Sequence, residues 1–186
     1  MQQLTKSADH KTALLTIGTG LALVQLLSRR VSPTPAHPRT FAWYAALRKP
    51  SAKPPDPVFG AIWPVLMTLM SAGTYRLLTK SANDTTRSAV AWWATSLALV
   101  AGYGLVTFGR RSLSGGVVVG AALVGSTAAF VRQASRSDRW AALLGLPILL
   151  WSAFGTLLTI SLAARNPELD GRDPGLIRRI TTRLGR

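Results

Sequence analysis

Five long apolar stretches, each flanked by arginine or lysine, limit most strongly what this chain can fold into. They cover residues 12–27, 58–78, 89–108, 113–131 and 140–164, and none of them contains an acidic residue. A helix needs about 20 mainly apolar residues to cross the hydrocarbon of a bilayer. A soluble core has no need of five helices that are apolar on all sides. The sequence therefore predicts an all-α, polytopic membrane protein built as a five-transmembrane-helix bundle.

The ends of two stretches need adjustment. The first stretch is short, so we expect it to reach full length through residues before Thr12 or through Val31. Arg76 lies inside the second stretch near its end, where its long side chain can extend to the membrane interface.

The predicted membrane domain, residues 12–164, lies between a polar N-terminus, 1–11, and a basic C-terminal tail, 165–186. A long proline-rich loop, 28–57, separates the first two stretches. Its aromatic segment, 41–47, is expected at the membrane interface, where Trp and Tyr are enriched. The other connections are short, which predicts antiparallel neighbouring helices.

The start of the chain allows two interpretations. Lys6 and Lys11 before an apolar stretch resemble a secretory signal, which would be cleaved. Pro33 and Pro35 crowd the only candidate cleavage site, near Ala36. We therefore expect the first helix to be retained.

Composition excludes several kinds of site. The chain has no cysteine, so disulfides, thiolate metal sites and cysteine nucleophiles are absent. The two histidines, His10 and His37, lie outside the apolar stretches, and we expect no metal site. The net charge of +15 lies at helix ends and in the tail instead of in one patch. We therefore expect no nucleic-acid partner, but attraction of the basic loops and tail to anionic lipid headgroups, at about 1 kcal/mol per surface Lys or Arg.

The distribution of cations predicts the orientation. With five spans, the N-terminus and the connections at 79–88 and 132–139 share one side, which carries eight Lys and Arg. The long loop, the connection at 109–112 and the tail share the other side, which carries fourteen. Since positive residues favour the cytoplasm, we expect the N-terminus outside and the C-terminus cytoplasmic. A bacterial inner (cell) membrane is the default for long apolar helices.

Small and aromatic residues suggest where contacts form. Gly116 and Gly120 make a GxxxG step, which allows close helix contact either inside the bundle or at a dimer face. Trp63 and Trp151 lie deep in their stretches. An indole there offers a stacking face and one N–H donor to a flat apolar ligand such as a tetrapyrrole or sterol, or it serves ordinary packing.

Several chemistries lack the residues they need. No acidic residue lies at mid-membrane, where ion- and proton-coupled transporters generally place ionisable groups. No P-loop, zinc-protease or nucleophile-elbow motif is present. An enzyme acting on a porphyrin would need preorganised acid–base or electrostatic groups. We therefore expect no catalytic residues and no enzyme.

Two blocks of sequence carry a family pattern. The first is Lys49-Pro50-x-x-x-Pro54-Pro55-x-x-Val58-Phe59-x-x-x-Trp63, preceded by Trp43-Tyr44-x-x-Leu47. The second is Trp140-Ala141-x-x-Leu144-x-x-Pro147-x-Leu149-x-Trp151. Together they resemble the TspO/MBR family (tryptophan-rich sensory protein / translocator protein) from about Trp43 to Asn166. The resemblance implies a five-helix bundle, often dimeric, with a pocket that opens toward the first loop and binds porphyrins, haem-related pigments or sterols.

The resemblance implies a divergent member of the family. Positions where the family usually has Trp, Tyr or Asn are here Ser51 or Ala52, Pro57, Met67, Val100, Tyr103, Ile148 and Ile160. These changes remove much of the polar and aromatic lining, so the resemblance implies a more apolar ligand site.

The sequence leads to one main hypothesis and one alternative. The main hypothesis is a membrane protein that binds a hydrophobic or tetrapyrrole ligand (porphyrin, haem-related or lipid) in its bundle, for sensing or transport, with no required cofactor. The alternative is a structural or accessory subunit of a larger membrane complex. A homodimer or a complex subunit is expected. The candidate ligand residues are Trp63 and Trp151 for stacking, Phe59 and Met67 as an apolar wall, Arg48 and Lys49 for a propionate, and Pro147 and Trp43 from the family pattern.

Overall fold

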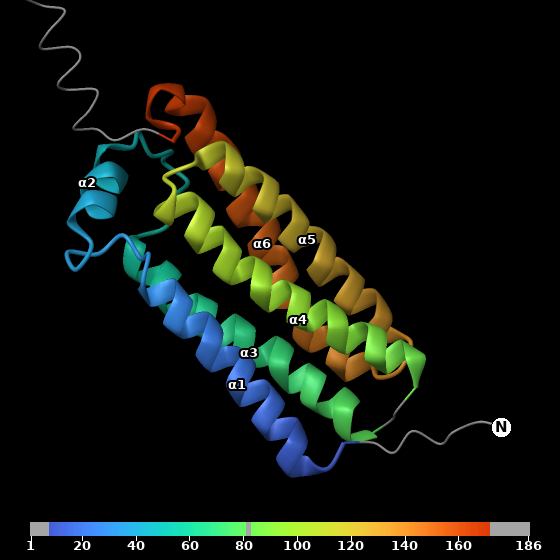
Figure 1. The fold of residues 1–186 in the computed structure, drawn as a ribbon. Helices are drawn as coiled ribbons and strands as arrows, with labels where there is room; N and C mark the ends of the chain where they lie inside the picture. Colours follow the sequence, from blue (N-terminus) through green and yellow to red (C-terminus); the bar gives the residue numbers. More distant parts are fainter. Residues whose placement is uncertain (1–7, 81–82, 172–186) are drawn as a thin grey trace, which may run out of the picture.

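The computed structural model describes residues 8–80 and 83–171, which form a helical bundle (Figure 1). Most of the predicted polar N-terminus and basic tail lies outside the described residues. The elements in chain order are α1 His10–Arg29, α2 Pro38–Ala46, α3 Asp56–Lys80, α4 Asp84–Gly104, the π-helix η1 Leu105–Gly109, α5 Leu113–Ser135, α6 Arg139–Arg165 and the 3-10 turn η2 Pro167–Leu169.

The prediction of five spanning helices is confirmed, because α1, α3, α4 with η1, α5 and α6 are each long and apolar enough to cross a membrane. The short first stretch reaches 20 residues because α1 begins at His10. The carboxylate of Asp9 caps α1 by accepting the N–H of Thr12 at 2.7 Å. α4 begins earlier than the predicted residue 89, since Asn83 caps it through the N–H of Thr86 at 2.8 Å.

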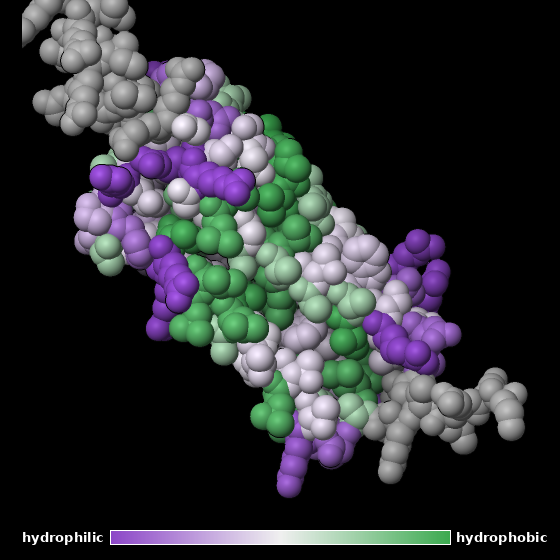
Figure 2. All heavy atoms as spheres, viewed as in Figure 1, coloured by the Kyte–Doolittle hydropathy of each residue, from purple (hydrophilic) through white to green (hydrophobic). Residues whose placement is uncertain are grey.

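The five spanning helices form a closed ring. α1 lies against α3 and α4, α5 lies against α4 and α6, and α6 lies against α3. Figure 2 shows apolar residues over the middle of the bundle and hydrophilic residues at its two ends. This distribution is that of a bundle whose middle lies in hydrocarbon and whose ends meet water.

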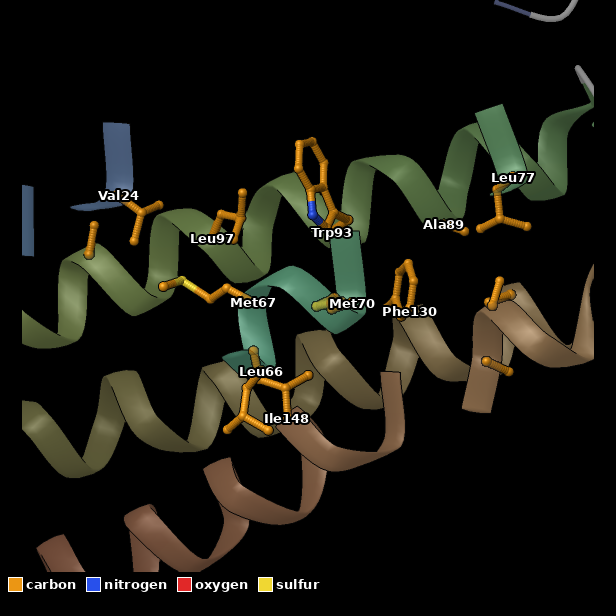
Figure 3. Close-up of a cluster of buried hydrophobic side chains, with 14 residues drawn as sticks. Val24, Leu66, Met67, Met70, Leu77, Ala89, Trp93, Leu97, Phe130 and Ile148 are labelled. Carbon is orange, nitrogen blue, oxygen red and sulfur yellow. The ribbon is translucent and has the colours of Figure 1, made fainter. Parts of the chain in front are cut away.

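The interior is a mixed core of apolar side chains and paired hydroxyls. Met67, Met70, Trp93 and Phe130 lie close together between α3, α4 and α5 (Figure 3), and each is at most 3% exposed. Trp93 donates its indole N–H to the hydroxyl of Ser71 at 3.0 Å. Such interhelical hydrogen bonds satisfy polar groups that would be costly in lipid.

The GxxxG step of α5 lies inside the bundle. A Cβ atom on Gly116 would meet the hydroxyl of Thr107, and one on Gly120 would lie 2.8 Å from the hydroxyl of Thr156. Of the two interpretations of this step, the structure shows packing within the chain. A homodimer stays a prediction and would have to use another face.

Candidate ligand-binding site

Aromatic rings extend from the end of the bundle that carries α2 to the middle of α6. We call them the aromatic cluster, which consists of Tyr44, Phe59, Tyr103, Phe108, Trp151 and Phe154. All six side chains are half-buried, whereas the core residues Met70 and Phe130 are fully buried. The cluster therefore keeps part of its aromatic surface open to contact.

The cluster consists of two rows of rings. In the first row, Trp151 of α6 lies between Phe59 of α3 and Phe154, with ring centroids 5.6 and 5.3 Å away. In the second row, Phe108 of η1 lies between Tyr44 of α2 and Tyr103 of α4, at 5.9 and 6.3 Å. These spacings are those of favourable aromatic pairs.

Lys53 joins the two rows. Its ammonium nitrogen lies 5.9 Å from the ring centre of Tyr44 and 5.7 Å from that of Phe59. It pairs with Asp56 at 2.7 Å, and its side chain is only 9% exposed. Tyr44 donates its hydroxyl to the same carboxylate at 2.5 Å, so α2 is tied to the start of α3. A partly desolvated cation over aromatic faces is well suited to meet an anionic group.

Lys49 provides a second cation at Tyr44. Its nitrogen lies 4.5 Å from the ring centre and donates to the carbonyl of Tyr44 at 2.6 Å. Burial lowers the pKa of Lys49, while the charge of Asp56 opposes this and that of Lys53 adds to it. Burial, together with the hydrogen bond to Asp56, raises the pKa of the Tyr44 phenol, so that it remains a neutral donor.

The indole N–H of Trp151 makes no hydrogen bond. Its indole nitrogen is buried and has no hydrogen-bond partner. Buried polar groups nearly always find a partner, and leaving one unpaired costs about 1–3 kcal/mol. The indole of Trp93, by contrast, is paired with Ser71. The donor of Trp151 is therefore free for an acceptor on a bound molecule.

The structure brings together only some of the residues predicted from sequence. Phe59 and Trp151 are in contact, and Lys49 lies beside the second row. Met67 is 2% exposed within the core, and Trp63 packs against that core. Met67 therefore has no exposed surface for a ligand unless the core opens.

The other three predicted residues lie elsewhere. Trp43 is fully buried and donates its indole N–H to the carbonyl of Leu169 at 3.0 Å. Arg48 extends outward, with its side chain 74% exposed, and pairs with Glu168 at 3.0 Å. Pro147 lies inside α6, one turn before Trp151. The roles predicted for these residues stay predictions.

Sequence reasoning did not select Tyr44, Lys53 or Asp56 as site residues. One signal was available: Lys53 and Asp56 carry opposite charges and stand only three residues apart, across the double proline. Their position over the aromatic rings depends on how α2 packs, which no local pattern reveals. Within residues 8–80 and 83–171, no group of three His, Asp or Glu side chains is placed to hold a metal ion.

The ring of five apolar helices defines an integral membrane protein. The profile of the TspO/MBR family matches residues 12–165, and the chain belongs to this family. The resemblance seen in the two sequence blocks is thereby confirmed.

Three characterised proteins show the extent of the similarity. The translocator protein of Homo sapiens is 32% identical over 142 residues, which cover 75% of this chain and 83% of that protein. Protein CrtK of Rhodobacter capsulatus is 30% identical over 127 residues, covering 68% and 79%. The tryptophan-rich protein TspO of Chlorobaculum tepidum is 30% identical over 158 residues, covering 84% and 96%. One of these relatives is named a translocator protein and another a tryptophan-rich protein.

Proposed function

We propose that this protein binds a flat, hydrophobic ligand bearing a carboxylate, such as a porphyrin, at the aromatic cluster, for sensing or transport. The observation that carries the proposal is the buried, unpaired indole N–H of Trp151 between the rings of Phe59 and Phe154. A bound molecule that brings an acceptor to this donor would give it a partner.

The surroundings of Trp151 fit both parts of such a ligand. The half-buried rings offer stacking faces to a flat conjugated molecule. The ammonium group of Lys53 already donates to Asp56 and to the carbonyl of Pro54, which leaves one of its three N–H donors for a ligand carboxylate. Such a charge-assisted contact is stronger than a neutral hydrogen bond. In this role Lys53 takes the place proposed from sequence for Arg48, whose side chain extends outward to Glu168.

Three of the departures from the family pattern support a site limited to this region. Ile148 is fully buried in the core, as Met67 nearly is, so both serve packing. Ile160 is 45% exposed on α6 and does not belong to the core. The polar groups that remain for a ligand at the aromatic cluster are the indole N–H of Trp151 and the ammonium groups of Lys49 and Lys53.

The experiment is a titration of the purified protein in detergent with protoporphyrin IX and with its dimethyl ester, which lacks the carboxylates. We expect saturable binding of the acid and binding of the ester weaker by about tenfold, because a hydrogen bond to a charged group is lost. Lys53→Met should weaken binding of the acid and leave binding of the ester unchanged. Lys11→Met, at an exposed lysine of α1, is the matched control. No saturable binding of either compound would reject the proposal and favour the accessory-subunit alternative, for which copurification of a stoichiometric partner is the test.

We further propose a bacterial inner membrane, with the N-terminus outside and the end that carries α2 in the cytoplasm, next to anionic lipid. The larger number of cations at that end supports this orientation. The chain has no cysteine, so single cysteines can be read without background. On intact cells, a membrane-impermeant maleimide should label Ser137→Cys and spare Ser51→Cys. The reverse labelling pattern would indicate the opposite orientation.

A further inference from the structure

Two cations of α3 share one carboxylate at the end of the bundle opposite α2. The carboxylate of Asp138 accepts hydrogen bonds from Arg76 and Lys80 at 3.0 Å each. It also accepts the N–H groups of Trp140 and Ala141 at 2.8 and 3.2 Å. The two carboxylate oxygens thus have four donors already, and the group keeps an excess of positive charge because two cations face one anion.

The two cations have N–H donors to spare. Arg76 bonds Asp138 through one terminal nitrogen, and its buried Nε has no hydrogen-bond partner among the described residues. An arginine carries five N–H donors and a lysine three. The side chains of Arg76 and Lys80 are 34% and 57% exposed, so a second anion can reach them from outside the bundle. Such an anion would gain charge-assisted hydrogen bonds from both residues.

Neighbouring residues place these cations at the level of the lipid headgroups. Trp140 is exposed at the start of α6, two residues after Asp138, and the guanidinium of Arg139 lies 5.3 Å from its ring centre. Tryptophan is enriched where the membrane meets water. Figure 1 shows the end of α3 beside the start of α6, at the end of the bundle away from α2. The anions at this level are the phosphates of lipid headgroups.

The cations belong to a face of α3 that continues toward the middle of the membrane. Residues on this face follow one another at steps of three and four, the spacing of one side of a helix, and they are Val65, Leu69, Ala72, Arg76 and Lys80. Val65 is 56% exposed and Ala72 is also exposed. The face is therefore open to lipid along its length.

α1 and α6 border this face on its two sides. Tyr75 hydrogen-bonds His10 of α1 at 2.7 Å, and Gly73 packs closely on the backbone of Ala141 in α6. These two contacts lie on opposite sides of Arg76 around the helix. The open face of α3 is thus a strip between two neighbouring helices.

The strip contains an open apolar groove of about 280 Å³, lined by Pro64, Val65, Thr68 and Leu69. The hydroxyl of Thr68 donates to the carbonyl of Pro64 at 2.8 Å, so the one polar side chain among the four is already paired. Thr68 and Val65 precede Arg76 by eight and eleven residues, or about 12 and 16 Å along a helix. Half of the hydrocarbon core is about 15 Å. The groove therefore lies where the acyl chain of a lipid held at Arg76 would end.

We propose that Arg76 and Lys80 bind the phosphate of an anionic phospholipid whose acyl chain follows Ala72 into the groove at Thr68 and Val65. The excess positive charge selects a lipid with a net negative charge, such as phosphatidylglycerol, over a zwitterionic lipid. The site lies away from the aromatic cluster and needs no ligand there. Failure of porphyrin binding would leave this proposal untouched, and failure of lipid binding would leave the proposed function untouched.

The test is native mass spectrometry of the full chain released from a neutral detergent, which counts bound lipids. The probes are long-chain phosphatidylglycerol, long-chain phosphatidylcholine, dihexanoyl phosphatidylglycerol and inorganic phosphate. We expect one saturable equivalent of long-chain phosphatidylglycerol and binding of phosphatidylcholine weaker by about fivefold, the effect of one surface charge. The dihexanoyl lipid should bind more weakly, because its chains do not reach the groove. These comparisons use the unaltered protein and do not depend on the folding of a variant.

A first pair of variants tests the headgroup contact. Lys80→Met removes one cation and keeps the pair of Arg76 with Asp138, so the fold is retained. It should weaken long-chain phosphatidylglycerol by about tenfold, the effect of losing a hydrogen bond to a charged group. Arg132→Met, at an exposed cation in the last turn of α5, is the matched control and should change nothing.

A second pair of variants tests the groove. Thr68→Phe fills it and should weaken the long-chain lipids while leaving the dihexanoyl lipid unchanged. Thr95→Phe, at an exposed threonine in the middle of α4, is the matched control.

Four results would each overturn the proposal. The first is the absence of saturable phosphatidylglycerol binding. The second is equal weakening by Lys80→Met and Arg132→Met, which would mean that any surface cation attracts the lipid. The third is displacement of the lipid by an equal concentration of inorganic phosphate, which would indicate a site for a free anion. The fourth is equal weakening by Thr68→Phe and Thr95→Phe, since the acyl chain would then not use the groove.

Discussion

Asp138 lies at the end of the bundle opposite α2, and removing its charge should destabilise the fold. Its side chain is 7% exposed and accepts hydrogen bonds from Arg76 and Lys80 at 3.0 Å each. It also caps α6 by accepting the N–H groups of Trp140 at 2.8 Å and Ala141 at 3.2 Å. Asp138→Asn keeps a good capping side chain but loses the charge. We expect it to lower the free energy of unfolding by about 2 kcal/mol, the scale of buried hydrogen bonds to charged groups.

The pH dependence of stability tests the contribution of Asp138 independently. Burial alone would raise the pKa of Asp138, but the hydrogen bonds from Lys80, Ala141, Trp140 and Arg76 outweigh it and lower the pKa from 3.8 to about 2. A lowered pKa stabilises the fold fully above about pH 4, and this stabilisation is lost as the pH falls toward about 2. Asp138→Asn should not show this part of the loss of stability at low pH.

The assay is reversible unfolding in detergent, followed by circular dichroism from neutral pH down to pH 2. Asp84→Asn is the matched control, because Asp84 also begins a helix and pairs with Arg87, yet its side chain is 97% exposed. We expect it to change stability by less than about 0.5 kcal/mol. Equal effects of Asp138→Asn and Asp84→Asn at neutral pH would refute the reasoning.

Two further predictions concern helix packing and can be measured by the same unfolding assay. A Cβ on Gly73 would lie 2.7 Å from the carbonyl oxygen of Ala141, so Gly73→Ala should destabilise by about 1–3 kcal/mol as α3 and α6 are forced apart. Gly125→Ala, where a Cβ meets open space, should be neutral or stabilising; destabilisation equal to that of Gly73→Ala would contradict the packing. Trp93→Phe should cost more than about 1 kcal/mol, because it leaves the Ser71 hydroxyl without its donor and removes part of a buried indole; no change would contradict both contacts.

The spanning helices could be predicted from sequence because the bilayer imposes a length and a composition on each of them. Their ends were less certain, since caps such as Asp9 and Asn83 lie outside the apolar residues. The GxxxG step of Gly116 and Gly120 predicted close contact but not its partner. That choice depends on where Thr107 and Thr156 come to lie, which is a property of the folded bundle.

The candidate site was predictable only in part. Phe59 could be selected from the family pattern, and Trp151 from that pattern and from its depth in the apolar stretch. The role of Lys53 depends on the fold of the proline-rich loop, and the side chain of Asn166 hydrogen-bonds the backbone of Arg48 across 118 positions. Contacts between such distant polar residues leave no periodicity in the sequence. Tertiary packing alone brings them together.

The most direct measurement of ligand binding at the aromatic cluster is the dissociation constant of protoporphyrin IX for Trp151→Phe. This variant keeps an aromatic ring beside Phe59 and Phe154 but removes the buried, unpaired N–H donor. We expect binding weaker by about tenfold, the effect of one buried hydrogen bond, with the fold retained by circular dichroism. Trp140→Phe, which removes an exposed indole, should bind as the unaltered protein does. Equal dissociation constants for all three proteins would show that the ligand does not use Trp151.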